Sequence, residues 1–380
     1  MVYILCQYDN GRSGRRLNSS PAGVSYVDYL IDVLKATGRK VKVVSIATGK
    51  NKSYFSSKTL VVDEKEEIIY LPTLRQGGTI CLRLAQVFSC LQVLYLLVFR
   101  IDKEDKIILY HDRGISVFYS VVRRFIRRQY YYFIGEIFSA VYDKGVSSIQ
   151  SEIKCVQGAK GYILINNVMP KLLGNISNYC VCHGRYKLPK VDLQDFNDGK
   201  IHVVYAGKID QRNVTDAFIA VQAAKFLDSG FRMHILGYGT PKDISALKIK
   251  ITEINNNKQI NIVSYDGCLF GDEYDNFLMK CNVGLCTRIM TGYKANLCFP
   301  SKTIVYLAHG LDVVAPDIEV LRTSDVSNCM TYISGDLTPS KVAEAIMRIK
   351  ITHKTEIMNK IEFLNNNFMQ SIDDMLSYDK

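Results

Sequence analysis

The sequence predicts an α/β protein with two doubly wound, parallel-sheet domains. Its 380 residues are long for one domain and comfortable for two. In both halves, short apolar runs typical of buried strands alternate with helical patterns, which is the repeat of a doubly wound sheet. A polar, turn-rich stretch from Pro189 to Lys200 predicts the linker. We therefore expect an N-terminal domain at 1–190, a second domain at 191–350 and a C-terminal helical segment at 351–380.

Composition narrows the class of protein and of partner. Hydrophobic residues make up 48% of the chain and charged residues 22%, which is typical of a globular protein. The net charge of +11 predicts an anionic partner: nucleic acid, anionic lipid or a phosphorylated substrate. Nucleic acid is disfavoured because no recognisable binding module accompanies the charge. Cys180, Cys182 and His183 lack a second pair at zinc-site spacing, so packing is favoured over a metal site.

The expected compartment is the cytoplasm. Eleven cysteines without a CxxC pair fit a reducing environment better than disulfides. The apolar start gives way at once to charged residues, so no signal peptide is expected. No uncharged stretch reaches the ~18–20 residues that span a bilayer. The nearest, from Ile80 to Phe99, is interrupted by Arg83 and two glutamines and predicts a buried or membrane-surface helix.

The N-terminal half opens with a strand–loop–helix–strand unit. An apolar run at 1–6 is followed by a polar loop, an amphipathic helical pattern at 24–34 and a second apolar run at 41–46. Ligands of such a sheet bind at the carboxyl ends of the strands. A further apolar run at 106–110 delivers His111 to that edge. A lone histidine is more often structural, but this position makes His111 a candidate site residue.

A basic segment follows in the same half. The helix predicted at 117–128 has one apolar face and one arginine face, and aromatic residues at 130–133 come directly after it. A basic face beside interfacial aromatic residues predicts peripheral binding to an anionic surface, here the inner face of the cell membrane. A surface helix with a solvated arginine face is the alternative. The arginines concerned are Arg123, Arg124, Arg127 and Arg128.

The C-terminal half repeats the alternation. Strand-like runs at 202–206, 231–236 and 283–287 are separated by helical patterns. The last stretch, 357–376, carries apolar residues at helical spacing and predicts a long amphipathic helix. The terminal helix either packs on its own domain or returns to the first.

The most informative stretch runs from 299 to 316, FPSKTIVYLAHGLDVVAP. Pro300 suits the first turn of a helix, and Ser301 is placed to accept a hydrogen bond from the free amides there. Gly310 is expected to end the helix in a left-handed conformation before a buried strand. A helix start flanked by Lys302 predicts a site for an anion such as a diphosphate. An ordinary helix with a solvated Lys302 is the alternative.

FPSKTIVYLAHGLDVV resembles the nucleotide-sugar signature of retaining GT-B glycosyltransferases, above all the bacterial surface-polysaccharide enzymes of glycosyltransferase family 4. PAG, YAGK, LGYG and YDG are similar to other segments of that family and occur in its order. The resemblance implies two Rossmann-like domains facing across a cleft, with a C-terminal helix crossing back. It also implies transfer of a sugar from a nucleoside-diphosphate sugar to a glycan or lipid-linked glycan, as in capsule or O-antigen synthesis.

The resemblance also implies roles for individual residues. His111 would contact the donor sugar, while Lys208 and Lys302 would hold the diphosphate; these three are the expected catalytic residues. No acidic pair is committed to a metal, so catalysis without a metal or cofactor is expected. The expected donor- and acceptor-binding residues are Gly23, Lys208, Arg212, Gly237, Tyr238, Gly267, Asn296, Ser301, Lys302 and Thr303.

One departure bears on activity. The family has two glutamates separated by seven residues, and these positions fall here on Leu297 and Val305. The donor site is therefore atypical, and a catalytically inactive GT-B protein that binds a glycan or partner is an alternative. A nucleotide-sugar epimerase with the same architecture is another. A nicotinamide dehydrogenase is disfavoured because no GxGxxG follows a strand.

Overall fold

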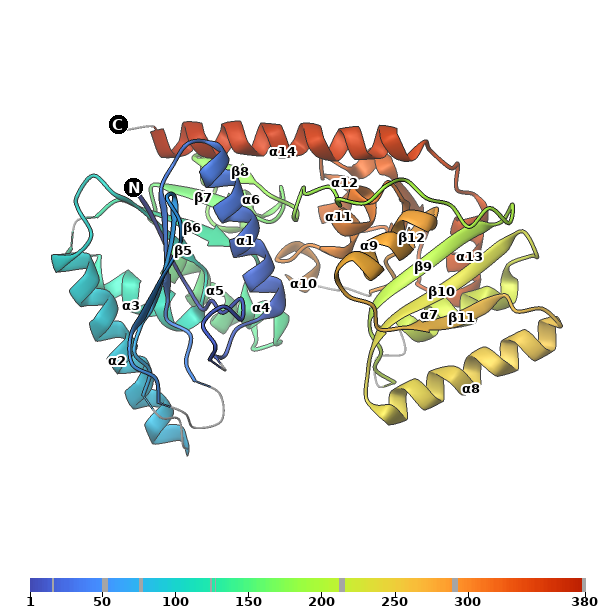
Figure 1. Ribbon diagram of the computed structural model, residues 1–380, viewed down its shortest axis with the longest axis horizontal. Helices are drawn as coiled ribbons and strands as arrows, with labels where there is room; N and C mark the ends of the chain where they lie inside the picture. The colour runs from blue at the N-terminus through green and yellow to red at the C-terminus, as the bar shows by residue number, and fades with distance from the viewer. Residues whose placement is uncertain are drawn as a thin grey trace. The chain divides into compact units, whose positions relative to one another are not determined.

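The computed structural model describes residues 1–15, 17–49, 54–74, 78–123, 125–126, 128–211, 216–288 and 293–377. The chain forms two compact units, each described here by itself (Figure 1). Unit 1 comprises Met1–Arg185, Asn296–Phe299 and Asn366–Lys380, and unit 2 comprises Tyr186–Ala295 and Pro300–Asn365.

Unit 1 is built on an eight-stranded sheet of order β3-β4-β2-β1-β5-β6-β7-β8. All neighbours are parallel except β3, which runs antiparallel to β4 at the edge. The order of the strands reverses between β1 and β5, which is where such sheets bind ligands. The strands are β1 (Val2–Cys6), β2 (Val41–Ser45), β3 (Lys58–Asp63), β4 (Glu66–Tyr70), β5 (Lys106–Tyr110), β6 (Tyr130–Ile134), β7 (Gly161–Leu164) and β8 (Tyr179–Val181).

Helices cover both faces of this sheet. Helix α1 lies on one face, and α2 and α3 lie side by side on the other (Figure 1). Ser20 caps α1 by accepting a hydrogen bond from the Gly23 amide, and Pro21 occupies its first turn. The helices are α1 (Pro21–Ala36), α2 (Gly78–Phe99), α3 (Arg113–Val122), α4 (Phe138–Val141), α5 (Val146–Val156) and α6 (Met169–Leu172).

The aromatic run after α3 differs from the sequence-based expectation. Residues 130–133 form most of strand β6 and are buried, so the prediction that they are interfacial is wrong. The helix before them ends at Val122, well before Arg128. A strand in the middle of a parallel sheet is covered on both faces, which explains its continuous run of large apolar rings.

Unit 2 is a six-stranded parallel sheet of order β11-β10-β9-β12-β13-β14. Its order reverses between β9 and β12, as in a doubly wound nucleotide-binding sheet. The strands are β9 (Ile201–Lys208), β10 (Phe231–Tyr238), β11 (Val263–Gly267), β12 (Val283–Leu285), β13 (Asp312–Pro316) and β14 (Met330–Ile333). The helices are α7 (Ala217–Ala223), α8 (Pro241–Lys258), α9 (Gly271–Lys280), α10 (Tyr293–Asn296), α11 (Lys302–Ala308), α12 (Glu319–Arg322) and α13 (Pro339–Met347).

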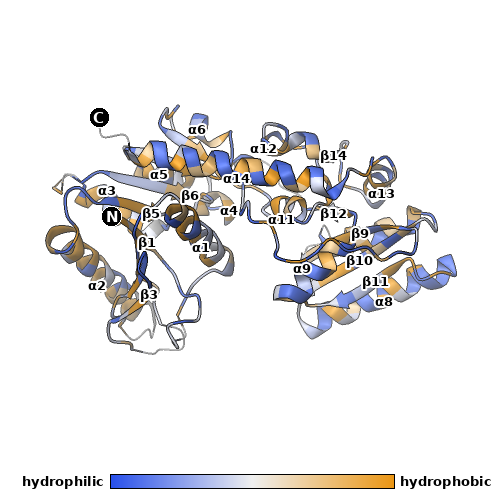
Figure 2. Cartoon of the chain, turned by 45° about the horizontal axis from the view of Figure 1, so that its top comes forward, coloured by the Kyte–Doolittle hydropathy of each residue, from blue (hydrophilic) through white to orange (hydrophobic). Residues whose placement is uncertain are grey.

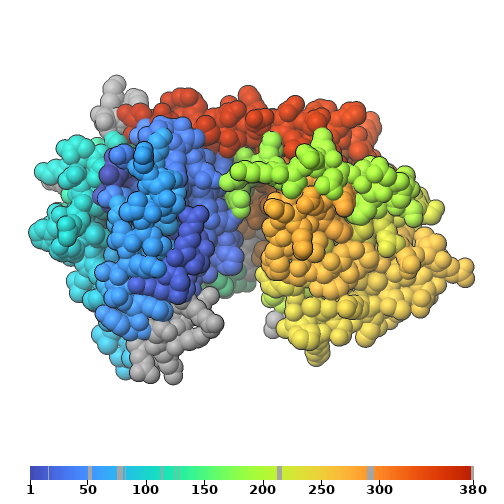
Figure 3. All heavy atoms as spheres, viewed as in Figure 1, coloured from blue at the N-terminus to red at the C-terminus, as the bar shows by residue number. Residues whose placement is uncertain are grey.

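The two sheets confirm the predicted α/β class. Apolar residues follow the strands of both sheets in Figure 2, where they form the cores. Helix α8, yellow in Figure 3, lies on the outside of unit 2. The second part of the stretch 299–316 also folds as expected. Gly310 ends α11 in the left-handed conformation, with φ +72°, and the strand β13 that follows is buried.

The predicted terminal helix is α14 (Lys354–Ser377). Its first half belongs to unit 2 and its residues from Asn366 belong to unit 1. In unit 1, Phe368 stacks on Tyr29 of α1 at 5.9 Å between ring centroids, and Asp373 pairs with Arg39. Within the described ranges, no helix is long and apolar enough to cross a membrane.

Candidate functional site

The strongest candidate site lies at the carboxyl edge of the unit 2 sheet, where β9 and β12 diverge. Helix α11 is fixed above this point by Tyr306. The Tyr306 hydroxyl accepts a hydrogen bond from the Ala206 amide of β9 at 2.9 Å. Its ring lies so close to Gly284 of β12 that a Cβ there would come within 2.2 Å of the ring carbon Cγ. Glycine at 284 therefore allows α11 to approach the sheet closely, and this close approach brings Lys302 to the end of β9.

Lys302 lies directly against the end of β9. Its Nζ is 4.2 Å from the centroid of the Tyr205 ring, within the range of a cation–π contact. A Cβ at Gly207 would lie 1.8 Å from the same Nζ, so glycine leaves the space that the ammonium occupies. Among the described residues, no hydrogen-bond or ion-pair partner engages this ammonium.

Burial lowers the pKa of Lys302. The charges of Cys286 and Asp216 oppose this shift, and the nearby Arg288 adds to it. A half-buried ammonium beside a second cation is destabilised by desolvation and by like charge. An anion bound here would relieve both effects. The arrangement is therefore suited to a phosphate or diphosphate group.

The strand ends around Lys302 are closely packed. Gly237 of β10 lies opposite Gly207 of β9, with φ +149°, and a Cβ at Gly237 would lie 1.7 Å from the Gly207 carbonyl oxygen. The Tyr265 hydroxyl donates a hydrogen bond to the Gly237 carbonyl at 2.9 Å. Tyr238 is exposed, and Gly267 has φ +92° with open space around the position of a Cβ. The backbone alone therefore accounts for glycine at 237 and 267, independent of any ligand.

The start of α11 differs from what the sequence suggested. Ser301 is exposed and helical in conformation, and its side chain makes no capping hydrogen bond, so the prediction that it caps the helix is wrong. Thr303 is buried, and its amide donates to the Pro300 carbonyl at 2.9 Å rather than being free. The Thr303 amide is therefore hydrogen-bonded within the turn that starts at Pro300 and does not point to an anion. The attraction for an anion thus rests on the Lys302 side chain.

The loop after β9 supplies another cation. Lys208 is 57% exposed at its side chain and pairs with Asp210 at 3.0 Å. A salt bridge this exposed is weak and can be exchanged for a ligand. Arg212, which the sequence places next in this loop, lies outside the described residues.

His111 of unit 1 is buried and fully engaged. Its Nδ1 lies 2.8 Å from Ser116 Oγ and its Nε2 lies 2.7 Å from Glu152 Oε1. Glu152 also accepts hydrogen bonds from the amides of Phe138 and Ser139, both at 2.8 Å. Burial alone would raise the pKa of Glu152, but the hydrogen bonds from His111 and Ser139 outweigh it and lower the pKa to about 2. The geometry favours the structural alternative for His111, since contact with a sugar would require one of these bonds to break.

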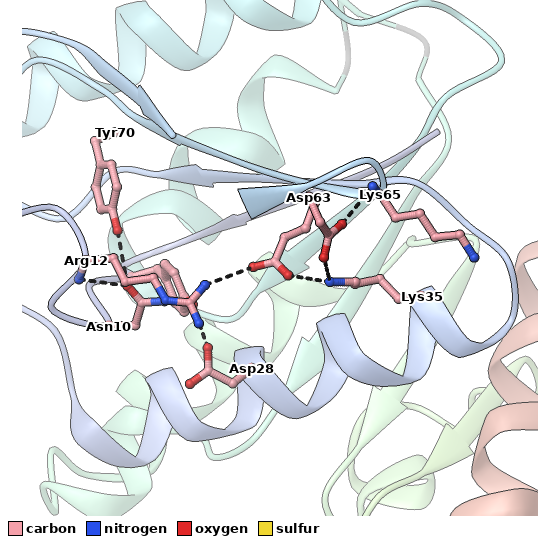
Figure 4. A network of polar contacts seen from close by, with 9 residues as sticks. Asn10, Arg12, Asp28, Lys35, Asp63, Lys65 and Tyr70 are labelled. Atoms are coloured by element: carbon pink, nitrogen blue, oxygen red, sulfur yellow. Dashed lines mark hydrogen bonds and ion pairs between the residues drawn. The ribbon is translucent and has the colours of Figure 1, made fainter. Parts of the chain in front are cut away.

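Unit 1 has a separate polar cavity of about 540 Å³ beside the loop after β1. The Tyr8 hydroxyl donates to Asp28 at 2.5 Å and accepts from Asn10 Nδ2 at 2.8 Å, which orders the cavity wall. Gly23 lies close by in α1 but does not line the cavity. Its lining residues are Asp9, Asn10, Gly11, Arg15, Leu17, Ser19, Pro21, Val24, Ser25, Asp28 and Arg185. The polar network extends through Arg12, Lys35, Asp63, Lys65 and Tyr70 (Figure 4).

The positions of the two family glutamates fall in different units. Leu297 belongs to unit 1 and is buried, and its carbonyl accepts a hydrogen bond from the Ile137 amide. Asn296 also belongs to unit 1, where its carbonyl accepts from Asn166 Nδ2 at 3.2 Å. Val305 lies in α11 of unit 2. Neither glutamate position therefore supplies a carboxylate.

The remaining candidate clusters have local partners. Cys182 Sγ donates to the Gly184 carbonyl, and His183 Nδ1 lies 3.0 Å from the Ile165 carbonyl oxygen. Across the described ranges, no three metal-ligating side chains form a metal-binding group.

Two arginines of the predicted membrane patch are also held internally. Arg123 donates to the Tyr130 hydroxyl at 2.6 Å, and Arg128 donates to the carbonyls of Leu97 and Ile101 at the end of α2. Arg124 and Arg127 lie outside the described residues.

Sequence reasoning missed Tyr306, Gly284 and Arg288. The signal for the first two is weak, because a tyrosine in a short helix and a glycine in a short strand acquire meaning only when the strand order places them together. Arg288 lies three residues after the end of β12, and its position beyond the carboxyl end of a strand could have marked it.

No family model matches the sequence, and no curated protein does. Solved structures do match. The OtsA apo structure has a TM-score of 0.67 at 10% identity, with 99% of each chain covered. A structure described as trehalose-6-phosphate from E. coli bound with UDP-2-fluoro glucose has a TM-score of 0.64 at 11% identity, covering 100% of this chain and 99% of that one.

Anabaena Alr3699/HepE in complex with UDP has a TM-score of 0.64 at 15% identity, again with 99% of each chain covered. At these identities the likeness shows the fold. The chain has the GT-B fold of glycosyltransferases, with two units each built on a largely parallel sheet.

Proposed function

We propose that the protein is a retaining glycosyltransferase that moves a sugar from a nucleoside-diphosphate sugar to a glycan or lipid-linked glycan, in the synthesis of a surface polysaccharide. The observation that carries the proposal is the half-buried Lys302 ammonium, held against Gly207 at the carboxyl edge of a doubly wound sheet. Two proteins of the same fold are described with UDP or a UDP-sugar analogue, which supports this class of donor.

The chemical demand is to stabilise the diphosphate that leaves as the acceptor hydroxyl attacks the sugar. Lys302 and Arg288 supply positive charge at one edge of unit 2, and a half-buried cation acts more strongly than a solvated one. We assign Lys208 and Arg212, from the loop after β9, to the same diphosphate. Tyr238 and the backbone at Gly237 and Gly267 are assigned to the nucleotide. No metal or cofactor is required in this scheme.

For the acceptor, we propose the polar cavity of unit 1. It combines two carboxylates, Asp9 and Asp28, with two arginines, Arg15 and Arg185. Carboxylates accept hydrogen bonds from sugar hydroxyls, and arginines bind phosphate or acidic sugars. The cavity is large enough for one or two sugar rings by the usual size of ligand pockets.

The test is replacement of Lys302 by alanine, with UDP affinity measured by calorimetry and UDP release measured for a panel of sugar nucleotides. Lys302→Ala is expected to weaken UDP binding and to abolish turnover without loss of folding. Lys225→Ala is the matched control, because Lys225 is an exposed lysine of the same unit at the opposite edge of the sheet. Unchanged turnover of Lys302→Ala would refute the diphosphate assignment.

The same assays separate the alternatives. The absence of the two acidic residues at positions 297 and 305 favours an inactive GT-B protein, which would bind glycan or partner and release no UDP from any donor. An epimerase would produce a free altered sugar without an acceptor. Under the proposed function, UDP release rises when the acceptor is supplied and is unchanged by a chelator such as EDTA.

A further inference from the structure

Helix α2 presents an apolar face to solvent. On its inner side, Ala85, Val93 and Leu97 are buried against unit 1. The outward side chains are also apolar, although a surface helix ordinarily has polar residues there. They are Ile80, Leu84, Val87, Leu91, Tyr95, Val98 and Phe99, with exposed fractions between 46% and 76%.

The polar residues of α2 occupy its flanks instead of its outermost side. At ~100° per residue, the outward residues from Ile80 to Val98 fall within a strip of about 80°, and Arg83 and Gln86 lie to one side of it. The helix is therefore apolar on two opposite sides. One side is explained by the core of unit 1 and the other is not.

Helix α3 and the turn after it continue this surface. Val117, Val121 and Phe125 are 47%, 53% and 83% exposed, at a spacing of four residues. α2 and α3 contact one another, and Figure 2 shows both as largely orange. Their light-blue to turquoise atoms lie at the outer edge of unit 1 in Figure 3. We call these ten outward residues of α2 and α3 the α2–α3 apolar face.

The α2–α3 apolar face is large for a monomer. A free aromatic side chain contributes roughly 150–250 Å² and an aliphatic one less, so these three aromatic and seven aliphatic side chains, each about half exposed, give on the order of 800 Å². A typical monomer exposes contiguous apolar patches of only a few hundred Å², and larger ones mark protein or membrane contacts.

The charge around this face identifies the partner. Residues 78–100 contain Arg83 and Arg100 and no acidic residue, and residues 113–128 contain five arginines and no acidic residue. The nearest acids in the sequence, Asp102, Glu104 and Asp112, lie outside both segments. Two copies that met through this face would bring like charges together, which disfavours a dimer. An anionic lipid surface instead complements both the apolar and the cationic groups.

We propose that the α2–α3 apolar face docks onto the surface of an anionic lipid bilayer, with α2 lying along the interface. Arg123 and Arg128 act within the protein, because Arg123 donates to the Tyr130 hydroxyl and Arg128 donates to the carbonyls of Leu97 in α2 and of Ile101 just after it. The exposed Arg83 and Arg100, on α2 and directly after it, are the groups that reach lipid headgroups. The proposal is independent of sugar transfer, because it uses none of the residues assigned to donor or acceptor.

The test is co-sedimentation of the full chain with vesicles of phosphatidylethanolamine and phosphatidylglycerol, compared with vesicles of phosphatidylcholine alone. The wild type is expected to bind the anionic vesicles at low salt and to be released as salt rises. The variant Leu84→Glu/Leu91→Glu is expected to bind at least tenfold more weakly. Both positions are exposed, so the variant keeps its fold and its UDP affinity. Val61→Glu is the control, since Val61 is an apolar residue on β3 of the same unit that is even more exposed than Leu84 and Leu91.

Two results would overturn the proposal. One is equal vesicle binding by the wild type and the double variant. The other is no binding of the wild type to the anionic vesicles. If analytical ultracentrifugation then shows a dimer that the double variant loses, the face belongs to a second copy of the chain. Because UDP affinity is measured on the same samples, failure of the membrane proposal is distinguishable from failure of the proposed function.

Discussion

A single methyl group added at Gly207 tests the central site. In Gly207→Ala the new Cβ would lie 1.8 Å from Lys302 Nζ and 2.7 Å from Cε, so the end of that side chain must move away. The substitution adds no backbone strain, because the φ of Gly207 is not in the left-handed region. The moved atoms are the far end of a flexible chain. We therefore expect the free energy of unfolding to change by less than about 1 kcal/mol.

The functional effect is expected to be much larger. A hydrogen bond from a charged group contributes about 1.5–3 kcal/mol. Displacing the ammonium from its place over Tyr205 should therefore weaken UDP binding roughly tenfold to a hundredfold, since about 1.4 kcal/mol corresponds to tenfold. Isothermal titration calorimetry with UDP measures this change, and thermal unfolding of the same sample verifies the fold.

A double-mutant cycle with Lys302→Ala decides the cause. If Gly207→Ala acts by moving Lys302, the two changes are not additive, and Gly207→Ala has little effect in the Lys302→Ala background. The reasoning is refuted if Gly207→Ala binds UDP as tightly as the wild type. Full additivity would also refute it, because the methyl group would then act without Lys302.

Three further predictions concern the same elements. Gly237→Ala should destabilise unit 2 by about 3 kcal/mol or more, seen in thermal unfolding, because its Cβ would meet the Gly207 carbonyl and its φ is +149°. The pKa of Glu152 is lowered from 4.5 to about 2 in the folded protein, so this carboxylate contributes about 3 kcal/mol to the free energy of unfolding above pH 4.5. The contribution is lost as the pH falls toward 2. Glu152→Gln should therefore abolish this part of the acid dependence, measured by urea unfolding. Burial lowers the pKa of Lys302, and bound UDP should raise it, as followed by NMR of labelled lysine.

Each of these has a contrary outcome. A Gly237→Ala protein with wild-type melting would mean that the ends of β9 and β10 separate at little cost. An unchanged acid profile in Glu152→Gln would mean that another carboxylate dominates acid unfolding. A Lys302 pKa that UDP leaves unmoved would place the diphosphate elsewhere.

Much of the fold followed from local patterns, because strands and helices of a doubly wound sheet alternate along the chain. The prediction failed at 130–133, where four consecutive aromatic residues suit a membrane interface and a central strand equally well. Tyrosine carries both a hydrophobic ring and a polar hydroxyl, so composition alone cannot distinguish the two. The strand order does, since β6 lies between β5 and β7.

The candidate site was less accessible to sequence reasoning. The stretch at 299–316 pointed to Lys302, but Gly207 and Tyr205 lie far away along the chain and meet it only because β9 neighbours β12. His111 was placed correctly at the end of β5, whereas its partner Glu152 comes from α5, which no local pattern connects to it. The spacing of residues along the sequence indicates which side chains are close within one helix or strand. It does not indicate which side chains meet across a sheet.

The boundary between units is crossed four times by the chain, after residues 185, 295, 299 and 365. Neither half is consequently a single uninterrupted piece of polypeptide. A recombinant fragment ending at Arg185 would lack the segment 296–299 and the part of α14 that covers Tyr29 and pairs with Arg39. Limited proteolysis or gene truncation at the linker should therefore give a first fragment that is insoluble, because unit 1 is complete only with the part of α14 that follows Asn365.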